Sequence, residues 1–361
     1  STRFIYDVKS FCQEVEGKMK AAVLHKALDL RVEEVDPPKI GSNDALVRIR
    51  SVGICGSDVH FYLYGRAASF TVTNPLILGH ECAGEVAEIG DEVRQVRVGQ
   101  RVVIEPGFPC GKCHFCKEGR YNLCRSLRFY AAPPYHGAFA EYASASEENV
   151  YPMPDIMSYE EGAMIEPLAV GMMAAKRGLV SVYDTVAILG SGPIGLMCLQ
   201  SAKAHGALDV YVTDIIDYRL DYAERLGAKA VINVERENLV RRVMELTHNE
   251  GVDVVIEAAG SVSALQQAFD IVKPGGRIVL VGIFPSMEFQ VPLGNVLTKE
   301  LDVRGVWRYV NVFPAAIKAV SDGKIDVRSL ITHRFPLDAI LKGFETQIKK
   351  IGNPVKIQIS I

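Results

Sequence analysis

The stretch VAILGSGPIG, residues 186–195, decides the fold class. It combines an apolar strand with a glycine turn, and a helical pattern then continues to His205. In a G-x-G-x-x-G turn the first glycine turns the chain and the second lets the backbone approach a phosphate. The third lets the helix pack on the strand, while the positive end of the helix faces the phosphate charge. A glycine-rich structural turn is the alternative, but the flanking strand and helix favour a dinucleotide site.

The residues expected to bind the cofactor follow from this turn. Asp214 lies 19 residues after Gly195, at the end of the next predicted strand, where a carboxylate can accept hydrogen bonds from ribose hydroxyls and repel a 2′-phosphate. Arg219 could instead help to bind a phosphate, but the acid favours NAD over NADP. The predicted cofactor residues are Gly190, Gly192, Pro193, Ile194, Gly195, Asp214, Ile215 and Arg219.

Strands and helices alternate on the C-terminal side of the turn. Continuous apolar strands between helices indicate a parallel sheet that is covered on both faces. Six such strands predict a doubly wound α/β fold of the Rossmann type. The predicted strands are Val186–Leu189, Val210–Thr213, Val231–Val234, Val252–Glu257, Arg277–Val281 and Val303–Trp307.

The N-terminal half has a different pattern, in which short strands are separated by glycine turns and predict a β-barrel-like domain. Its predicted strands are Lys20–His25, Leu30–Val35, Ala45–Val52, Gly84–Ile89, Gln100–Glu105 and Ala138–Ala143. From Val310 onward the chain adds a helix and a strand-like segment, Val355–Ile361, which we expect to close on the first domain. We therefore predict a catalytic domain of residues 1–166 with 310–361, and a cofactor domain of residues 167–309. Residues 1–18 read as an extension.

Four cysteines fall within 15 residues: Cys110, Cys113, Cys116 and Cys124. Four thiolates complete the tetrahedral shell of zinc and leave no position for water, so this site is predicted to be structural. Four reduced surface cysteines are the alternative. His114 lies inside the loop but is not needed as a ligand.

A second set of metal-ligating residue types is dispersed along the chain. Cys55 follows an apolar strand, His80 and Glu81 follow Pro75–Leu78, and Glu166 lies at the domain junction. A thiolate, an imidazole and a carboxylate leave an open coordination position, which is the composition of a catalytic zinc site. A buried thiol and a core histidine are the alternative reading of Cys55 and His80.

These motifs resemble, in this order, the zinc-containing medium-chain alcohol dehydrogenases. The resemblance rests on Cys55–His60 (CGSDVH), on Gly79-His80-Glu81 with Gly84 and Gly90, on the four cysteines, on Glu166-Pro167-Leu168 and on the glycine turn. It extends from about Met19 to the end of the chain. It is strongest to the polyol branch, which comprises sorbitol, xylitol and arabinitol dehydrogenases. GVWRY at 305–309 and THRFPL at 332–337 resemble that branch too.

The resemblance implies a GroES-like catalytic domain, a Rossmann domain and an active site between them. It implies that Cys55, His80 and Glu81 hold a catalytic zinc, and that Glu166 ligates it directly or through water. In the ethanol-oxidising relatives a cysteine usually occupies the position of Glu166, so the glutamate favours the polyol branch. The cofactors implied are NAD and two zinc ions per subunit, one catalytic and one structural.

Further roles concern the proton and the substrate. Ser57 and His60 could pass a proton outward, because a histidine titrates in the suitable range; a plain surface histidine is the alternative. By resemblance, Arg308 and Tyr309 contact the polyol, although Arg308 could also be a plain surface residue. Phe61 stands where sorbitol dehydrogenases often carry tyrosine, which could alter the choice of polyol.

Composition excludes several function classes. With a net charge of −3 and no long basic run, the chain has no electrostatic footprint for nucleic acid. No stretch approaches the roughly 18 apolar residues that span a bilayer, and the N-terminus lacks a signal peptide. We therefore expect a cytoplasmic enzyme without nucleic-acid or membrane partners. The resemblance implies a small polyol or ketose as the substrate and a homotetramer or homodimer as the assembly.

Three other functions use some of the same sequence features. A zinc alcohol or threonine dehydrogenase would use the same machinery on another small hydroxyl substrate. A binding protein that had lost catalysis would not need the proposed catalytic residues. All five are present in this chain: Cys55, Ser57, His60, His80 and Glu81. A zinc-ribbon nucleic-acid binder is disfavoured because the basic residues around the cysteines are outweighed by the negative net charge of the chain, −3.

Overall fold

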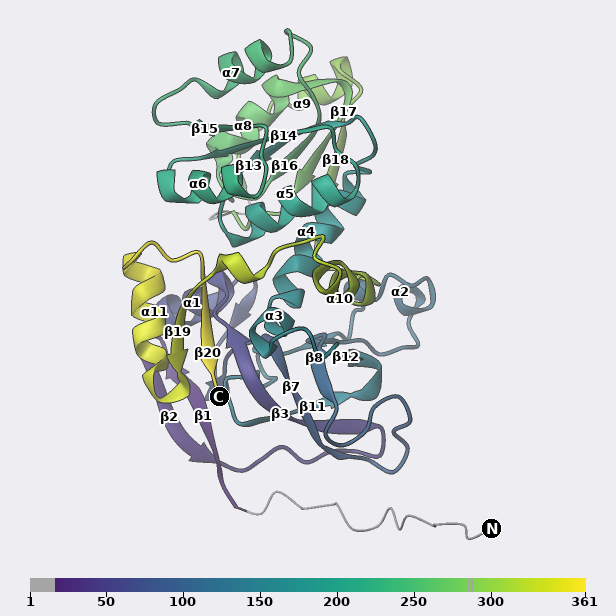
Figure 1. Cartoon of the computed structure of the whole chain (residues 1–361), viewed down its shortest axis with the longest axis vertical. Helices are drawn as coiled ribbons and strands as arrows, with labels where there is room; N and C mark the ends of the chain where they lie inside the picture. Colours follow the sequence, from purple (N-terminus) through teal and green to yellow (C-terminus); the bar gives the residue numbers. More distant parts are fainter. Residues whose placement is uncertain (1–16, 285, 287) are drawn as a thin grey trace.

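The protein is described here from a computed structural model that places residues 17–284, 286 and 288–361. The predicted extension, residues 1–18, lies almost wholly outside this part of the chain. Two domains follow one another along the long axis of the molecule (Figure 1). The N-terminal and C-terminal segments together build the lower domain, and the middle of the chain builds the upper one.

The lower domain is the predicted β-barrel. A seven-stranded sheet has the order β12-β8-β7-β3-β20-β19, with β11 paired to β3, and a three-stranded sheet has the order β2-β1-β6. The principal strands are β1 (Met19–Lys26), β2 (Asp29–Val35), β3 (Asp44–Gly53), β6 (Leu76–Ile77), β7 (Glu81–Ile89), β8 (Arg101–Ile104), β11 (Tyr142–Ser146) and β12 (Val150–Pro152). Alternating apolar residues of these strands fill one core. The strand predicted at Ala138–Ala143 begins later, at Tyr142.

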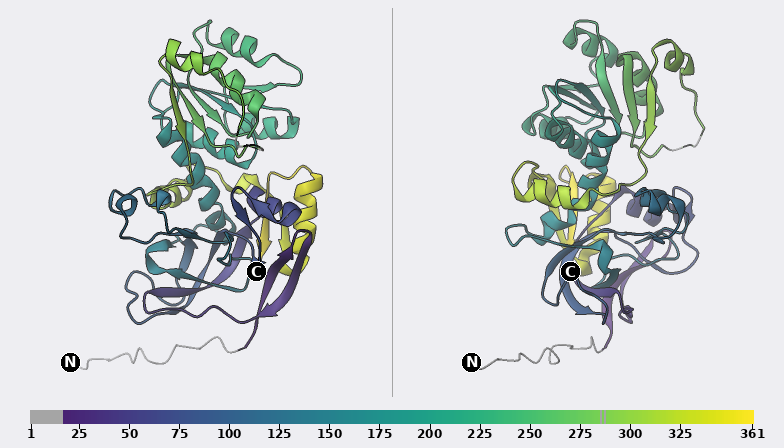
Figure 2. Two further views of the ribbon diagram at one scale, coloured as in Figure 1. Left: turned by 180° about the vertical axis from the view of Figure 1, so that it is seen from behind. Right: turned by 90° about the vertical axis from the view of Figure 1, so that its right-hand side faces the viewer.

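The C-terminal tail packs on the barrel and contains more helices and strands than the sequence predicted. It contains α10 (Phe313–Ser321), β19 (Ile331–Pro336), α11 (Ile340–Lys349) and β20 (Lys356–Ser360), where the sequence had predicted one helix and one strand. β20 pairs antiparallel with β3, and Gln358 lies opposite Gly53. Both views of Figure 2 place this yellow segment against the barrel. The prediction of a single helix was therefore wrong.

The upper domain is the predicted doubly wound fold. Its six parallel strands have the order β15-β14-β13-β16-β17-β18, which is the arrangement of dinucleotide-binding sheets. They are β13 (Thr185–Leu189), β14 (Asp209–Asp214), β15 (Ala230–Asn233), β16 (Val252–Glu257), β17 (Val272–Leu280) and β18 (Asp302–Gly305). Helices α5 (Pro193–Ala204), α6 (Asp217–Arg225), α7 (Leu239–Leu246), α8 (Val262–Ile271) and α9 (Leu293–Thr298) connect them.

One helix, α4 (Ile165–Arg177), joins the two domains. Its residues belong to an apolar cluster that includes Ala83 of the barrel and Val186 of the parallel sheet. At Gly171 an added Cβ would lie 2.7 Å from the backbone of Met197, so α4 packs closely on α5. No helix in the described residues is long and apolar enough to cross a membrane.

Candidate active site

The pairing of two strands brings three dispersed residues together. Gly53, at the end of β3, lies opposite Glu81, at the start of β7. Cys55 follows β3 as the residue that caps helix α1 (Gly56–Tyr64), and His80 directly precedes β7. The ligand atoms of Cys55, His80 and Glu81 consequently lie within 4.8 Å of one another.

Asp58 holds the two loops of this cluster in place. Its side chain is fully buried, and its carboxylate accepts hydrogen bonds from the amides of Cys55 (3.0 Å) and Gly79 (3.1 Å). One of its oxygens is 3.7 Å from Nδ1 of His80. Burial alone would lower the pKa of His80, but the charges of Asp58 and Cys55 outweigh burial and raise it to about 10. A metal ion that binds His80 therefore displaces a proton.

Glu81 has a buried cationic partner. Lys356 of β20 is 3% exposed, forms an ion pair with Glu81 and donates a hydrogen bond to the carbonyl of Ile54 (3.1 Å). Burial lowers the pKa of Lys356, yet the charge of Glu81 raises it overall, so the ammonium form is favoured. Gly53 is required beside this pair, because an added Cβ would lie 2.0 Å from Oε2 of Glu81.

The donor set fits a zinc ion with one open side. Within the described part of the chain, Oε2 of Glu81 is buried, and its charge is balanced by the ammonium group of Lys356. A thiolate, an imidazole and this oxygen match the protein ligands of catalytic zinc sites. The cluster contains three protein ligands and does not include Glu166.

Glu166 lies at the start of α4, buried near the cluster. Oε1 of Glu166 accepts a hydrogen bond of 2.7 Å from the hydroxyl of Tyr309, which is 3% exposed. Burial raises the pKa of Glu166 to about 6, while the charge of His80 opposes this shift. Glu166, predicted at the zinc, and Tyr309, predicted at the substrate, are thus in direct contact although 143 residues separate them.

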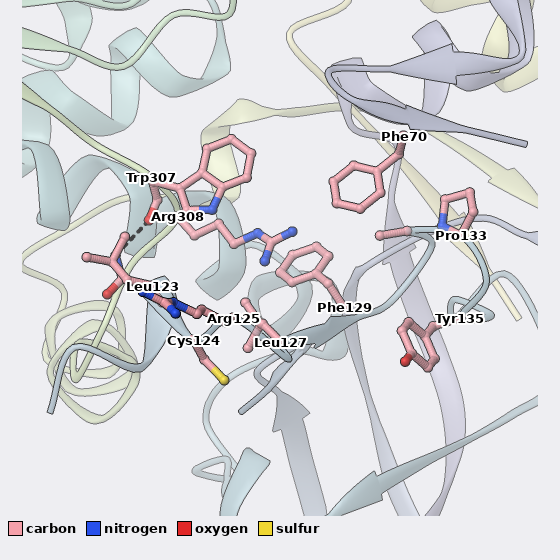
Figure 3. A pocket seen from close by; sticks show the side chains of 12 residues that line it. Phe70, Leu123, Cys124, Arg125, Leu127, Phe129, Pro133, Tyr135, Trp307 and Arg308 are labelled. Carbon is pink, nitrogen blue, oxygen red and sulfur yellow. Dashed lines mark hydrogen bonds between the residues drawn. The ribbon is translucent and has the colours of Figure 1, made fainter. Parts of the chain in front are cut away.

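A cavity of about 380 Å³ opens beside this site. Figure 3 shows Arg308 between the rings of Trp307 and Phe129, with Phe70 and Tyr135 around the same space. The guanidinium carbon of Arg308 is 3.9 Å from the ring centroid of Phe129, and that ring lies 5.5 Å from the His80 ring. Burial lowers the pKa of Arg308. A cation and aromatic walls therefore lie next to the metal cluster.

The other predicted residues of this region lie on α1. Ser57 is half-buried, and His60 is exposed with its ring 5.9 Å from that of Tyr64. Phe61 is 4% exposed and belongs to the barrel core.

The four cysteines gather in one surface loop. The sulfurs of Cys110 and Cys116 are 4.0 Å apart, and those of Cys113 and Cys116 are 3.4 Å apart. These distances bracket the roughly 3.8 Å between sulfurs in a tetrahedral site with zinc–sulfur bonds of about 2.3 Å. Amides of Lys112 and Cys113 lower the pKa of Cys110 to about 6, which favours the thiolate that binds metal.

The glycine turn has the shape that a dinucleotide requires. Gly190 has φ +101°, and an added Cβ at Gly195 would lie 1.9 Å from the carbonyl oxygen of Gly190. Gly192 precedes Pro193, the first residue of α5, and an added Cβ there would meet only Nη1 of Arg219, at 3.8 Å. The space over Gly192 is therefore open for a phosphate at the helix N-terminus.

Asp214 ends β14 beside this turn. One of its oxygens accepts hydrogen bonds from the amide (2.7 Å) and hydroxyl (2.9 Å) of Ser191, and the other from the amides of Ile215 and Ile216. Nε of Arg219 is buried without a hydrogen-bond partner among the described residues. A carboxylate and an unpaired guanidinium nitrogen thus flank the predicted phosphate position.

Comparison with known proteins identifies the family. A model of the alcohol dehydrogenase GroES-like domain matches residues 41–155, and one of zinc-binding dehydrogenases matches residues 193–322. The chain belongs to the zinc-containing medium-chain dehydrogenase family, and within it to the polyol dehydrogenase branch. It is 40% identical to the sorbitol dehydrogenase of Bacillus subtilis over 345 residues, which cover 96% of this chain and 98% of that protein.

Solved structures agree with this assignment. An Escherichia coli oxidoreductase of unknown specificity has a TM-score of 0.92 at 38% identity, covering 96% of this chain and 99% of that one. A structure described as a zinc-binding dehydrogenase from Sinorhizobium meliloti, bound to NADP, has a TM-score of 0.89 at 32% identity, with 96% and 100% covered. The predicted fold and the use of zinc and a nicotinamide dinucleotide are therefore confirmed.

Three residues of the site were missed from the sequence: Asp58, Lys356 and Phe129. Asp58 stands three residues after Cys55, at the spacing of a helix-capping acid, which is a readable signal. Lys356 is a lone charge between Val355 and Ile357 in an apolar strand, which indicates a buried partner without naming it. Phe129 carries no such signal.

Proposed function

We propose that this chain transfers hydride between a secondary hydroxyl of a polyol and NAD, and so interconverts a polyol and its ketose. The observation that carries this proposal is the meeting of Cys55, His80 and Glu81 within 4.8 Å of one another. The ring of Phe129, which lines the cavity beside Arg308, lies next to the ring of His80. The relatives at about 40% identity are named sorbitol dehydrogenases.

Cys55, His80 and Glu81 would hold the catalytic zinc, which when bound polarises a hydroxyl, while the nicotinamide accepts the hydride. In this proposal Glu166 acts through a water molecule or a substrate hydroxyl rather than as a ligand. Two observations support this: its Oε1 accepts the hydrogen bond of Tyr309, and it lies outside the ligand cluster. Arg308 would donate hydrogen bonds to further hydroxyls of the chain-like substrate. Phe61 would act on polyol choice only through packing, since it lies in the barrel core.

The proton of the substrate hydroxyl must leave a buried site. Ser57 is half-buried next to the cluster and His60 is exposed on the same helix. In this proposal Ser57 relays the proton, accepting it while passing on the proton of its own hydroxyl, and His60 delivers it to solvent.

We further propose that the cofactor is NAD. Asp214 presents its carboxylate beside the glycine turn, where a 2′-phosphate would meet like charge. One structural neighbour holds NADP, so the choice depends on this chain's own residues and needs a direct comparison of the two cofactors.

The alternative is a zinc alcohol or threonine dehydrogenase, and a substrate panel separates the two. The purified, zinc-loaded enzyme is assayed for NADH formation with sorbitol, xylitol, arabinitol, ethanol and threonine. We expect the highest kcat/KM with one of the polyols. Turnover of ethanol or threonine without turnover of any polyol would overturn the proposal.

The assembly and the compartment are proposals as well. We propose a homodimer or homotetramer, supported by exposed apolar residues on α9 and on the edge strand β18: Leu293, Leu297 and Val303. We propose a cytoplasmic location, because none of the seven cysteines in the described residues forms a disulfide.

A further inference from the structure

The segment Trp307–Asn311, here named the selector segment, carries the two residues that the proposed function assigns to the polyol. Arg308 stacks on Phe129 at 3.9 Å, and Tyr309 donates to Glu166 at 2.7 Å. The segment follows β18 and leads from the cofactor domain back to the barrel. Its conformation therefore sets where both side chains lie relative to the metal cluster.

Two residues of the selector segment have a left-handed backbone conformation. Arg308 has φ +59° and Asn311 has φ +53°. Residues with a Cβ adopt such left-handed conformations at an energetic cost, and they keep them where the surroundings impose them. Something must hold the selector segment in this shape.

The loop that contains the four cysteines, residues 110–124, here named the cysteine lobe, supplies that hold. Nδ2 of Asn122 donates to the carbonyl of Trp307 (2.9 Å), and Nδ2 of Asn311 donates to the carbonyl of Gly119 (3.2 Å). The amide of Asn311 donates to the hydroxyl of Tyr121 (2.9 Å). Three hydrogen bonds thus tie both ends of the selector segment to one face of the lobe.

The lobe also forms a wall of the cavity. Asn122, Leu123 and Cys124 line the same 380 Å³ space as Trp307 and Arg308. Figure 3 shows Leu123, Cys124 and Arg125 on one side and Phe70 and Tyr135 on the other, with Arg308 reaching in from the lobe side. A shift of the lobe would therefore change the cavity as well as the segment.

We propose that the cysteine lobe is a positioning element for substrate: through Asn122 and Asn311 it clamps the selector segment, and so fixes Arg308 in the cavity that would hold the polyol and Tyr309 against Glu166. This inference rests on the proposed function for the identity of the substrate, but the clamp itself does not depend on it. The four sulfurs lie within 4.8 Å of one another in the lobe, so a bound zinc stiffens the loop that carries Gly119, Tyr121 and Asn122.

The single tryptophan of the chain, Trp307, reports on the clamp without any assay of activity. It is 48% exposed and its carbonyl is the acceptor of the Asn122 bond. Loosening of the selector segment would change its emission and its quenching by acrylamide.

The test uses the full-length, zinc-loaded enzyme with Asn122→Ala and Asn311→Gly, singly and combined. Glycine at 311 keeps the positive φ and removes only the side-chain bond. Lys117→Ala is the matched control, because Lys117 lies in the same lobe and its exposed side chain forms no hydrogen bond or ion pair among the described residues. Asn122→Gln, which keeps the amide donor, is the conservative variant.

We expect the double variant to raise KM for the polyol about fivefold to tenfold, with a smaller change in kcat, since each lost hydrogen bond is worth a few-fold in affinity. Acrylamide quenching of Trp307 should increase in parallel, with two zinc ions per chain retained. Lys117→Ala should match the wild type in both measurements, and Asn122→Gln should recover part of the loss.

A second arm removes the lobe zinc. Cys113→Ser should lower the zinc content from two ions to one and shift the emission of Trp307 in the same direction as the double variant. If Trp307 emission and quenching are unchanged in the double variant and in Cys113→Ser, the clamp is refuted, whatever the substrate is. If the quenching changes but polyol KM stays within twofold of wild type, the positioning role is refuted. Lack of turnover of any polyol by the wild type refutes the proposed function instead.

Discussion

The two predicted metal sites are built in opposite ways. The cysteine lobe takes all four ligands from one loop of 15 residues, most of them half-exposed. The catalytic cluster takes its ligands from two strand ends and surrounds them with fully or nearly fully buried charges, Asp58 and Lys356. The ligands of the cysteine lobe can therefore come together through the conformation of one loop, whereas those of the catalytic cluster come together only when the barrel is folded.

The first prediction separates the two sites. Cys55→Ala removes a ligand beside the open position, and we expect kcat/KM to fall by about 1000-fold or more, because metal polarisation of the hydroxyl is lost. Cys113→Ser removes a ligand of the closed site and should leave the catalytic zinc in place. Zinc content, circular dichroism and steady-state kinetics of both variants check this. Near wild-type turnover in Cys55→Ala would contradict the assignment of the catalytic site.

The second prediction concerns the buried partner that only the catalytic cluster has. Lys356→Met leaves Glu81 with an uncompensated buried charge, and we expect catalytic zinc affinity or activity to fall about 10- to 100-fold, as for other residues that orient metal ligands. Competition with a zinc chelator, followed by assay, measures the effect. Lys117→Ala at the lobe is the control, and an equal loss there would remove the contrast between the sites.

The third prediction concerns the cofactor turn, which, like the cysteine lobe, is built from residues close together in the sequence. In Asp214→Ser with Ile215→Arg, a hydroxyl and a cation replace the acid, so the ratio of kcat/KM for NAD to that for NADP should fall about tenfold or more. Steady-state kinetics with each cofactor give this ratio. An unaltered ratio would show that the ribose is bound elsewhere.

The fourth prediction uses Glu105, a buried carboxyl between the two sites. Its Oε2 accepts a hydrogen bond of 3.0 Å from Tyr151, and burial raises its pKa to about 7. The folded state then binds more protons than the unfolded state between roughly pH 4.5 and 7, so the stability contributed by this group falls as pH rises through that window. Because glutamine does not ionise, Glu105→Gln should remove this decrease in folding stability with rising pH.

In thermal unfolding between pH 5 and pH 8, Glu105→Gln should therefore be less sensitive to pH than the wild type, by at most about 3 kcal/mol for a shift of this size. Melting curves at both values, with Glu250→Gln as an exposed control, measure the difference. An identical pH dependence in the variant and the wild type would place the pKa of Glu105 in the ordinary range.

The same contrast explains what could be predicted from the sequence. The glycine turn and the cysteine lobe are local patterns, so spacing alone predicts both the strand-turn-helix unit and the grouping of four sulfurs. The grouping of Cys55 with His80 depends on the β3–β7 register. The residue types alone are therefore equally compatible with a buried thiol and a core histidine, and only the family resemblance predicts a zinc site. The C-terminal tail shows the same limit. Helix α11 packs its apolar face on β19 and β20, and this contact between distant segments is not visible as a local sequence pattern.

Lys356 and Phe129 reach the site from segments far from the ligands in sequence. Lys356 is 275 residues from Glu81, and no local pattern connects two such positions. Asp58 is different, because its three-residue offset from Cys55 is local and could have been used. Sequence alone therefore predicts ligands better than it predicts the buried residues that hold them.

The most direct test of the central claim is metal analysis of the purified enzyme coupled to its activity with a polyol and NAD. We predict two zinc ions per chain, loss of NADH formation when the zinc of the Cys55 cluster is removed by a chelator, and recovery when zinc is added back. Full activity in protein that holds no metal at this cluster would contradict the account.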